Sequence, residues 1–308
     1  AIGRELGMRV FIKRDDCTGL GLGGNKSRKL EFTLGDALQK GADTIITSGG
    51  LQSNHVRHTA AAAAKLGLEC HAVLNNPLPD ADSAYRTSGN YLLDTWFGAT
   101  LYEVAGDTSA RIAKLEVDLA GRGRKPYVVP LGASHGIGAL GYVECARELL
   151  AQCGSNGIEP SHVFVTTGSA GTHGGLLAGL RLFGSPMHVI GVSISETPAI
   201  KRTKVRGIVD QVMTVLARGD SPVRGDPVTD DDIVVFGDYM GDGYGVPTKA
   251  GDAAMRRLAR REGLLLDPVY TSKAMAGMLD LLENKRLGEV RDPIFLHTGG
   301  TPALFAYP

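Results

Sequence analysis

The feature that most constrains the fold is a regular alternation of short apolar runs with longer amphipathic segments. Strand-length runs rich in β-branched residues occupy residues 43–49, 69–75, 126–132, 162–168, 188–195 and 293–297. Helix-like segments occupy residues 54–67, 89–99, 137–153 and 171–184. This order predicts an α/β protein with parallel sheets covered by helices. Ligands of such proteins bind at the carboxyl ends of the strands, so the segments that follow the strands are the first candidates for a functional site.

Length and charge limit the functions that a chain of this kind can have. The chain has 308 residues, enough for two lobes. It carries 33 basic and 33 acidic residues, so neither a nucleic acid nor an anionic membrane surface is an expected partner. No apolar run approaches the roughly 18 residues of a membrane-spanning helix, and the first residues show no signal-peptide pattern.

The four cysteines lie far apart and form neither a disulfide framework nor a metal motif. They favour a reducing, cytoplasmic setting, and we expect no metal site. Glycine is the unusual residue, at 42 of 308, roughly twice its average usage. The glycines cluster at residues 19–24, 48–50, 168–175 and 299–300. Each cluster follows a strand-like run, which is where a backbone approaches a ligand.

The cluster "GSAGTHGG", residues 168–175, joins a predicted strand to a predicted helix. Free backbone N–H groups and the positive end of a helix dipole together bind a phosphate. Neither the Walker pattern nor the dinucleotide pattern is present, so a single phosphate on a small cofactor is the better interpretation. The alternative is a tight turn with no ligand.

The segment "SGGLQSNHVRH" places Ser53, Asn54 and His55 at the start of a helix. One of these residues is accounted for as an N-cap. The run has more polar groups than a cap uses, and a helix start suits a carboxylate, so the α-carboxylate of an amino acid is an expected ligand.

Two further segments supply candidate cofactor contacts. Tyr270 and Thr271 lie between an apolar run and a helix, and Tyr270 is a candidate to stack on a flat cofactor or to transfer a proton. Thr298 follows the strand at 293–297, where its hydroxyl can meet a ring nitrogen. The alternatives are core packing for the tyrosine and a backbone hydrogen bond for the threonine.

Together these features match the needs of pyridoxal 5'-phosphate, which also requires a lysine to form an imine with its aldehyde. Lys26, directly after "GGN", is the candidate for that lysine, and the task requires a partly desolvated amine with a lowered pKa. The alternative is an ordinary turn that leads into a solvated helix. Lys29, beside Arg28 and Glu31, is expected on a solvated helix face.

Several segments, in order and over nearly the whole chain, resemble one known family. They are "KRDDCTGLGLGGNKSRKLEF", "SGGLQSNHVRHTAAAAAKLG", "GSAGTHGGLLAGL", "GYGVP", "LLLDPVYTSKAMAG" and "LHTGGTPALFAY". The family is that of D-cysteine desulfhydrase and 1-aminocyclopropane-1-carboxylate (ACC) deaminase, in the tryptophan-synthase-β-like class. The resemblance implies a two-lobed fold type II enzyme and a homodimer. The smaller lobe, residues 40–139, is inserted in a larger pyridoxal-phosphate-binding lobe, residues 1–39 and 140–308.

The resemblance also assigns roles. It makes Lys26 the Schiff-base lysine, and it makes Ser53 and Tyr270 the other catalytic residues. The cofactor-binding residues it implies are Lys26, Asn54, Gly168, Ser169, Ala170, Gly171, Thr172, Tyr270 and Thr298. Asn54 would bond the ring oxygen, residues 168–172 would hold the phosphate, and Thr298 would meet the pyridine nitrogen. The expected substrate-binding residues are Ser53, Asn54, His55 and Thr271.

Two departures from the family pattern bear on the reaction. ACC deaminases carry glutamate where this chain has Thr271 and glutamine where it has His55, so ring-opening deamination is disfavoured. We expect an α,β-elimination on a β-substituted alanine, with D-cysteine giving pyruvate, ammonia and sulfide. The alternative is an L-cysteate sulfo-lyase, which releases sulfite and shares a motif close to "DDCTGL". A sulfonate pocket would need extra donors, such as Ser27 or Thr271 or an arginine.

Two other function classes stay open at the level of sequence. A family member that binds an amino acid or cofactor without turnover would lack Lys26. A nucleotide-dependent enzyme would need an acidic ribose contact, for which Glu196 is the nearest candidate. Family members usually have a further N-terminal segment, so we expect that part of the natural chain precedes residue 1.

Overall fold

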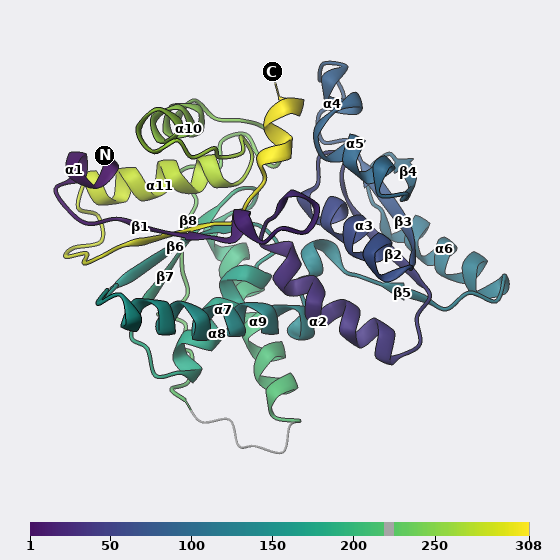
Figure 1. Ribbon diagram of the computed structural model, residues 1–308, viewed down its shortest axis with the longest axis horizontal. Coiled ribbons are helices and arrows are strands. Elements are labelled where there is room, and N and C mark those ends of the chain that lie inside the picture. Colours follow the sequence, from purple (N-terminus) through teal and green to yellow (C-terminus); the bar gives the residue numbers. More distant parts are fainter. Residues whose placement is uncertain (219–224, 308) are drawn as a thin grey trace.

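The computed structural model describes residues 1–218 and 225–307, and within these the strands form two parallel sheets (Figure 1). The five-stranded sheet has the order β1-β9-β6-β7-β8: β1 (Phe11–Arg14), β9 (Ile294–His297), β6 (His162–Thr167), β7 (His188–Ser193) and β8 (Val234–Phe236). The four-stranded sheet has the order β4-β3-β2-β5: β4 (Thr100–Val104), β3 (Glu69–Asn75), β2 (Thr44–Gly50) and β5 (Pro126–Val128). The predicted α/β class with parallel sheets is confirmed.

Helices cover both faces of the larger sheet. They are α1 (Ile2–Leu6), α7 (Gly136–Ser155), α8 (Gly171–Leu182), α9 (Pro198–Leu216), α10 (Lys249–Glu262) and α11 (Thr271–Glu283). Alternate residues of β6 point to opposite faces, as in any strand. Val163 and Val165 pack with α7, α8 and α9, whereas Phe164 packs with α10 and α11. Figure 1 shows these two helical layers on either side of the sheet.

The smaller sheet is covered in the same way. Its helices are α2 (Lys26–Gln39), α3 (Asn54–Leu66), α4 (Ala84–Thr87), α5 (Gly89–Trp96) and α6 (Ser109–Gly121). Ile45 of β2 packs with α2 and α3, and its neighbour Ile46 packs with α6 on the other face. Short 3₁₀ turns complete the chain: η1 (Asp15–Cys17), η2 (Leu20–Leu22), η3 (Leu131–Ala133) and η4 (Thr301–Ala306).

The predicted helix ends hold where glycine marks them. The α3 helix ends at Leu66, and Gly67 adopts the left-handed conformation, with φ 69°. The α2 helix ends at Gln39, two residues before Gly41, which has φ 73°. The polar, Pro- and Asp-rich sequence at residues 75–86 predicts a loop, and it is a loop that ends in α4. A second stretch of this kind, at 217–232, also predicts a loop, but its residues 219–224 lie outside the described residues. Within the described residues, the structure contains no helix that is both long and apolar enough to cross a membrane.

Candidate active site

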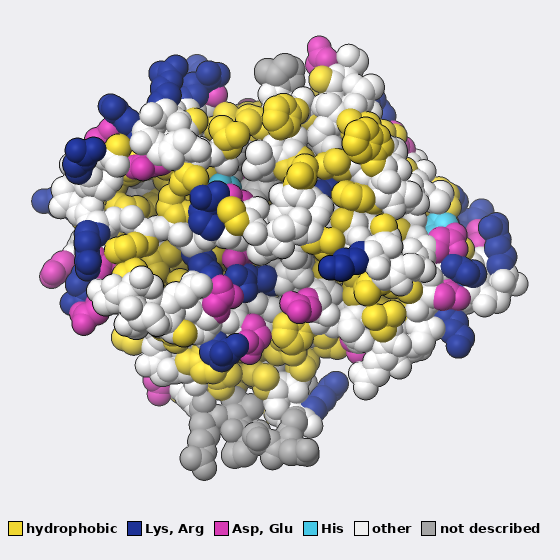
Figure 2. All heavy atoms as spheres, in the orientation of Figure 1, with side chains coloured by type: hydrophobic (Ala, Val, Ile, Leu, Met, Phe, Trp, Pro, Cys, Tyr) yellow, Lys and Arg dark blue, Asp and Glu magenta, His cyan; other side chains and the backbone are white. Residues whose placement is uncertain are grey.

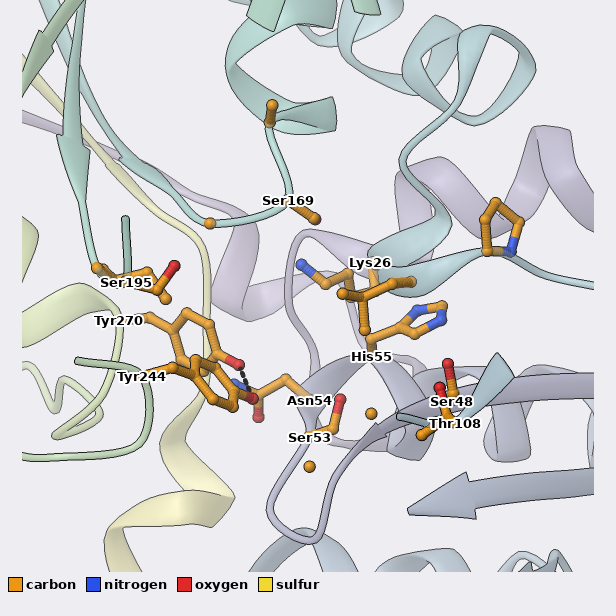
Figure 3. A pocket seen from close by; sticks show the side chains of 18 of the residues that line it. Lys26, Ser48, Ser53, Asn54, His55, Thr108, Ser169, Ser195, Tyr244 and Tyr270 are labelled. Carbon is orange, nitrogen blue, oxygen red and sulfur yellow. Dashed lines mark hydrogen bonds between the residues drawn. The ribbon is translucent and has the colours of Figure 1, made fainter. Parts of the chain in front are cut away.

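A cavity of about 630 Å³ lies where loops at the carboxyl ends of strands from both sheets meet (Figure 3). The predicted site residues that line it are Lys26, Ser53, Asn54, His55, Gly168, Ser169, Ala170, Thr172, Tyr270 and Thr298. Gly171 and Thr271 are buried behind it rather than in its lining. Residues far apart in the sequence therefore converge as parallel topology requires.

The turn before Lys26 explains its two glycines. Gly23 has φ 73°, and a Cβ there would lie 1.9 Å from the carbonyl oxygen of Asp16. Gly24 has φ 135°, and a Cβ there would lie 2.8 Å from the ring of His58. The backbone then joins the end of β9, where Asn25 donates its N–H to the carbonyl of Thr298 at 3.0 Å. This packing fixes the start of α2, and with it Lys26.

Lys26 has the surroundings expected for an imine-forming lysine. Burial and then the positive charge of Arg57 lower its pKa to about 8, although Asp267 opposes the shift. Arg57 is itself fully buried and donates to the carbonyls of Gly21 and Gly23, so it braces the turn as well. A substantial fraction of the Lys26 amine is therefore neutral near physiological pH.

The expectation of a solvated Lys29 is wrong. Only 1% of the residue is exposed, and its Nζ donates to Ser134 Oγ at 3.2 Å. Burial and the nearby charge of Lys26 lower the pKa of Lys29 well below its ordinary value. Two neighbouring lysines, Lys29 fully buried and Lys26 partly buried, favour an anion in the cavity.

Residues 168–172, predicted to bind a phosphate and called the anion cradle below, join β6 to α8. Ala170 has a left-handed conformation, with φ 69° and ψ −18°, and it precedes the first turn of α8. A bend of this kind at the positive end of a helix dipole suits an anion. The Gly171 N–H is not free for one, since it donates to Ser134 Oγ at 3.3 Å. A Cβ at Gly168 would meet nothing closer than 3.5 Å, so the cradle has room for a ligand.

Side chains tie the cradle to the lysine helix. The amide of Asn25 donates to Thr172 Oγ1 at 3.0 Å. The hydroxyls of Ser134 and Ser169 are 2.7 Å apart, and Ser134 also accepts from Lys29. These contacts position the anion cradle relative to the Lys26 amine.

The start of α3 forms a second polar site. Ser53 is the N-cap, accepting from the Val56 N–H at 3.3 Å, and it also lines the cavity. The side-chain oxygen Oδ1 of Asn54 accepts from Asn90 Nδ2 at 2.9 Å and from Arg57 at 3.4 Å. These contacts leave the Asn54 amide group as the donor that can reach a ligand.

His55 lines the cavity, but its ring is hydrogen-bonded to another side chain of the protein. Its Nε2 lies 2.8 Å from Thr47 Oγ1, and that hydroxyl donates to the carbonyl of Val129. Nε2 is therefore the donor in this contact. Burial, followed by the charges of Lys26 and Lys29, lowers the pKa of His55 well below its ordinary value, so the ring is neutral.

Tyr270 is paired with Tyr244, a residue that sequence reasoning missed. Their hydroxyl oxygens are 2.6 Å apart and both rings line the cavity (Figure 3). Burial is the main cause that raises the pKa of Tyr244 to about 12 and that of Tyr270 well above its ordinary value. Both hydroxyls therefore stay protonated at neutral pH.

Asp267 sets the backbone that carries Tyr270. Its carboxylate accepts from the N–H groups of Val269, Tyr270 and Thr271 at 2.8–2.9 Å. The Thr271 hydroxyl also donates to Asp267, at 2.7 Å. The structure thus places the Thr271 side chain in a turn, away from the position expected for a substrate contact.

The site fits pyridoxal phosphate. An open cradle can hold the phosphate, Lys26 can meet the aldehyde, and the Asn54 amide is a free donor. Thr298 lines the cavity at the end of β9 with its hydroxyl in reach of a ring. Within residues 1–218 and 225–307, no cluster of His, Cys, Asp or Glu could hold a metal ion.

Such a fold and cavity define an enzyme that holds a phosphorylated aldehyde beside a lysine. The sequence matches the family described as "Pyridoxal-phosphate dependent enzyme" over residues 1–299, and the chain belongs to that family. Pyridoxal phosphate is therefore its cofactor.

Curated relatives extend the similarity over almost the whole chain. The D-cysteine desulfhydrase of Yersinia enterocolitica (serotype O:8 / biotype 1B) is 48% identical over 304 residues, covering 98% of this chain and 89% of the relative. The D-cysteine desulfhydrase of Yersinia pestis (strain Pestoides F) is 46% identical over the same shares. The resemblance to this family is confirmed.

Solved structures agree on the architecture. An ACC deaminase homologue has a TM-score of 0.87 and 37% identity, covering 98% of this chain and 87% of its own. A serine racemase from maize has a TM-score of 0.69, covering 97% of this chain and 85% of its own. At 14% identity the second likeness shows the fold alone. The chain has the fold type II architecture of pyridoxal-phosphate enzymes.

Proposed function

We propose that the protein is a D-cysteine desulfhydrase, which converts D-cysteine and water to pyruvate, ammonia and sulfide. The observation that carries the proposal is the position of Lys26, a half-buried lysine with a lowered pKa in the cavity that the anion cradle and the start of α3 also line. The identity of 46–48% to proteins named D-cysteine desulfhydrase supports the choice of substrate.

When bound, pyridoxal phosphate supplies an aldehyde that condenses with amines and a conjugated ring that withdraws electrons from the substrate α-carbon. Residues 168–172 would hold its phosphate, Asn54 would donate to its ring oxygen, and Thr298 would meet its ring nitrogen. The start of α3, with Ser53 as its cap, receives the substrate carboxylate.

The two candidate proton-transfer groups differ in charge state. Lys26, with a pKa of about 8, can accept the α-proton once its amine is free. Tyr270 stays protonated, because its pKa is raised well above the ordinary value, and so it suits a proton donor to the departing sulfur. We assign Lys26 as base and Tyr270 as acid.

The names of the curated relatives support sulfide rather than sulfite as the leaving group, and the two hydroxyls expected in a sulfonate pocket do not line the cavity. A sulfonate would need extra donors, and Ser27 and Thr271 were the hydroxyls expected to supply them. Neither side chain lines the cavity: Ser27 lies 3.4 Å from the Thr18 hydroxyl, and Thr271 donates to Asp267.

The test is release of pyruvate by the cofactor-loaded protein, with D-cysteine, L-cysteine, L-cysteate and ACC in parallel. Pyruvate and sulfide from D-cysteine, absent in Lys26→Ala, are the expected result. Pyruvate and sulfite from L-cysteate, with little from D-cysteine, would replace the substrate assignment and keep the elimination. No pyruvate from any of the four would overturn the proposal.

We also propose that the enzyme acts in the cytoplasm as a homodimer. Among the large apolar side chains on its surface are Leu22, Trp96 and Phe305, which are 65%, 76% and 68% exposed. They belong to neighbouring segments, since η2 packs on α3, α3 on α5, and α5 on η4. Figure 2 shows hydrophobic side chains gathered on this face near the C-terminal end. We call the three side chains the apolar surface set.

The limits of the lobes are also a proposal. All four strands of the smaller sheet fall within residues 44–128, and all strands of the larger sheet lie outside that range. This supports a small lobe at residues 40–139, inserted in a large lobe at 1–39 and 140–308.

A further inference from the structure

Lys201 is a buried lysine that lines the cavity. It has no part in the proposed elimination. It lies in the first turn of α9 and is only 1% exposed. Its Nζ donates to the carbonyl oxygen of Gly168, to Ser195 Oγ at 3.0 Å and to Glu196 Oε2 at 2.7 Å. The ammonium thus joins the loop after β6, which is the anion cradle, to the loop after β7.

The contact with Gly168 bears directly on the cradle. The Gly168 carbonyl and the Ser169 N–H belong to one peptide group, so a cation on the oxygen polarises the N–H. Ser169 lines the cavity, in the loop that receives the phosphate. A charge-assisted bond to the carbonyl also fixes the orientation of that peptide.

We propose that Lys201 is a positioning residue for the cofactor phosphate: it orients the Gly168–Ser169 peptide and strengthens its N–H as a phosphate donor. The inference rests on the proposed function only in that both require bound pyridoxal phosphate. It adds to that function a residue that sets the affinity for the cofactor. Lys201 acts through the peptide and touches neither substrate nor ring.

Lys204 provides a matched control. It lies one helical turn further along α9, and its Nζ contacts both oxygens of Glu196 at 2.7 Å, but it is 48% exposed and has no hydrogen bond to the cradle. If ion pairing with Glu196 were all that mattered, replacing either lysine would have similar effects. If the bond to Gly168 matters, only Lys201 affects the phosphate.

The experiment titrates the cofactor-free full chain with pyridoxal phosphate and, separately, with pyridoxal, which lacks the phosphate. The readout is the absorbance of the imine at Lys26, which requires no turnover. We expect Lys201→Met to raise the Kd for pyridoxal phosphate at least about tenfold and the Kd for pyridoxal less than about twofold. Lys204→Met should change both by less than about twofold.

Two conservative variants keep the test decisive if Lys201→Met folds poorly. Lys201→Arg keeps the charge and Lys201→Gln removes it. We expect the arginine variant to bind pyridoxal phosphate more tightly than the glutamine variant, with equal affinities for pyridoxal. Equal affinities of the two variants for pyridoxal phosphate, an equal loss for both ligands, or a loss as large in Lys204→Met would overturn the inference.

The outcome is separable from the test of the proposed function. If the parent protein binds pyridoxal phosphate but makes no pyruvate from D-cysteine, the proposed function fails and the role of Lys201 can still be measured. If D-cysteine is consumed and Lys201→Met binds the cofactor as the parent does, only the role of Lys201 fails.

Discussion

At the scale of single residues, the charge state of Lys26 sets the pH dependence of cofactor loading. Only the neutral amine attacks an aldehyde, and lowering the pKa makes that form available at lower pH. With a pKa of about 8, about a tenth of the amine is neutral at pH 7. We expect the rate of imine formation, followed by absorbance on mixing cofactor-free protein with pyridoxal phosphate, to rise with pH and level off above about 8. A midpoint near the ordinary lysine value would contradict this environment.

Substitution of Tyr270 tests which residue is the base of the elimination and which is the acid. If Tyr270 protonates the departing sulfur, Tyr270→Phe should lower kcat for pyruvate release by about 100-fold. Exchange of the α-proton of D-cysteine with deuterated solvent should persist, because Lys26 performs it. Proton NMR measures the exchange, and pyruvate release measures the elimination. Loss of both together would make Tyr270 the base instead.

Tyr244→Phe is the companion variant. It removes the hydroxyl 2.6 Å from Tyr270 but leaves the Tyr270 hydroxyl in the cavity. We expect its kcat to fall less than that of Tyr270→Phe. An equal or larger fall would move the acid role to Tyr244.

At the scale of elements, the turn from η2 into α2 carries most of the steric constraint on the site. Gly23→Ala would place a Cβ 1.9 Å from a backbone oxygen, at φ 73°. We expect a loss of at least about 3 kcal/mol in the free energy of unfolding, because rigid backbone must move. Gly67→Ala, at φ 69° with no heavy atom within 4 Å, should cost about 1 kcal/mol. Urea denaturation measures both, and similar losses would show that the Gly23 turn relaxes freely.

The strands whose bounds periodicity predicted most closely are buried on both faces. The β3 and β6 strands fall at 69–75 and 162–167, almost as predicted, because their runs are short, apolar and β-branched. The β4 strand was not predicted, since Thr100–Val104 is partly exposed and carries a glutamate. The β8 strand, Val234–Phe236, was not predicted either and has only three residues.

The candidate site likewise contains residues that the sequence predicted and residues that it did not. Residues that follow a strand or begin a helix were found, because topology alone gathers them. Lys29 was placed wrongly because its charged neighbours were given more weight than its spacing: positions 26 and 29 share a helix face, so a Lys26 that faces the cavity brings Lys29 inward with it. Tyr244 lies in the segment "GYGVP", which resembles the family but was given no role, and Lys201 lies in a segment with no site pattern. Only the tertiary structure brings these two side chains to the cavity.

At the scale of the whole molecule, the proposed homodimer must cover exposed apolar area. The apolar surface set is on the α3 and α5 side of the smaller sheet, while α6 covers the opposite face. Val117, on α6, is also strongly exposed, at 73%, and it serves as a control for the effect of a new surface charge.

We expect Trp96→Glu combined with Phe305→Glu to shift the protein from dimer to monomer in sedimentation velocity. The free-energy penalty of burying two carboxylates at an apolar interface exceeds the stabilisation that the apolar contact provides. Val117→Glu should leave the dimer intact. Circular dichroism spectra that match the parent would show that each lobe is still folded, so a monomer signal reports the interface alone. A dimer that survives the double substitution would place the interface elsewhere, and a monomeric parent protein would rule out the homodimer itself.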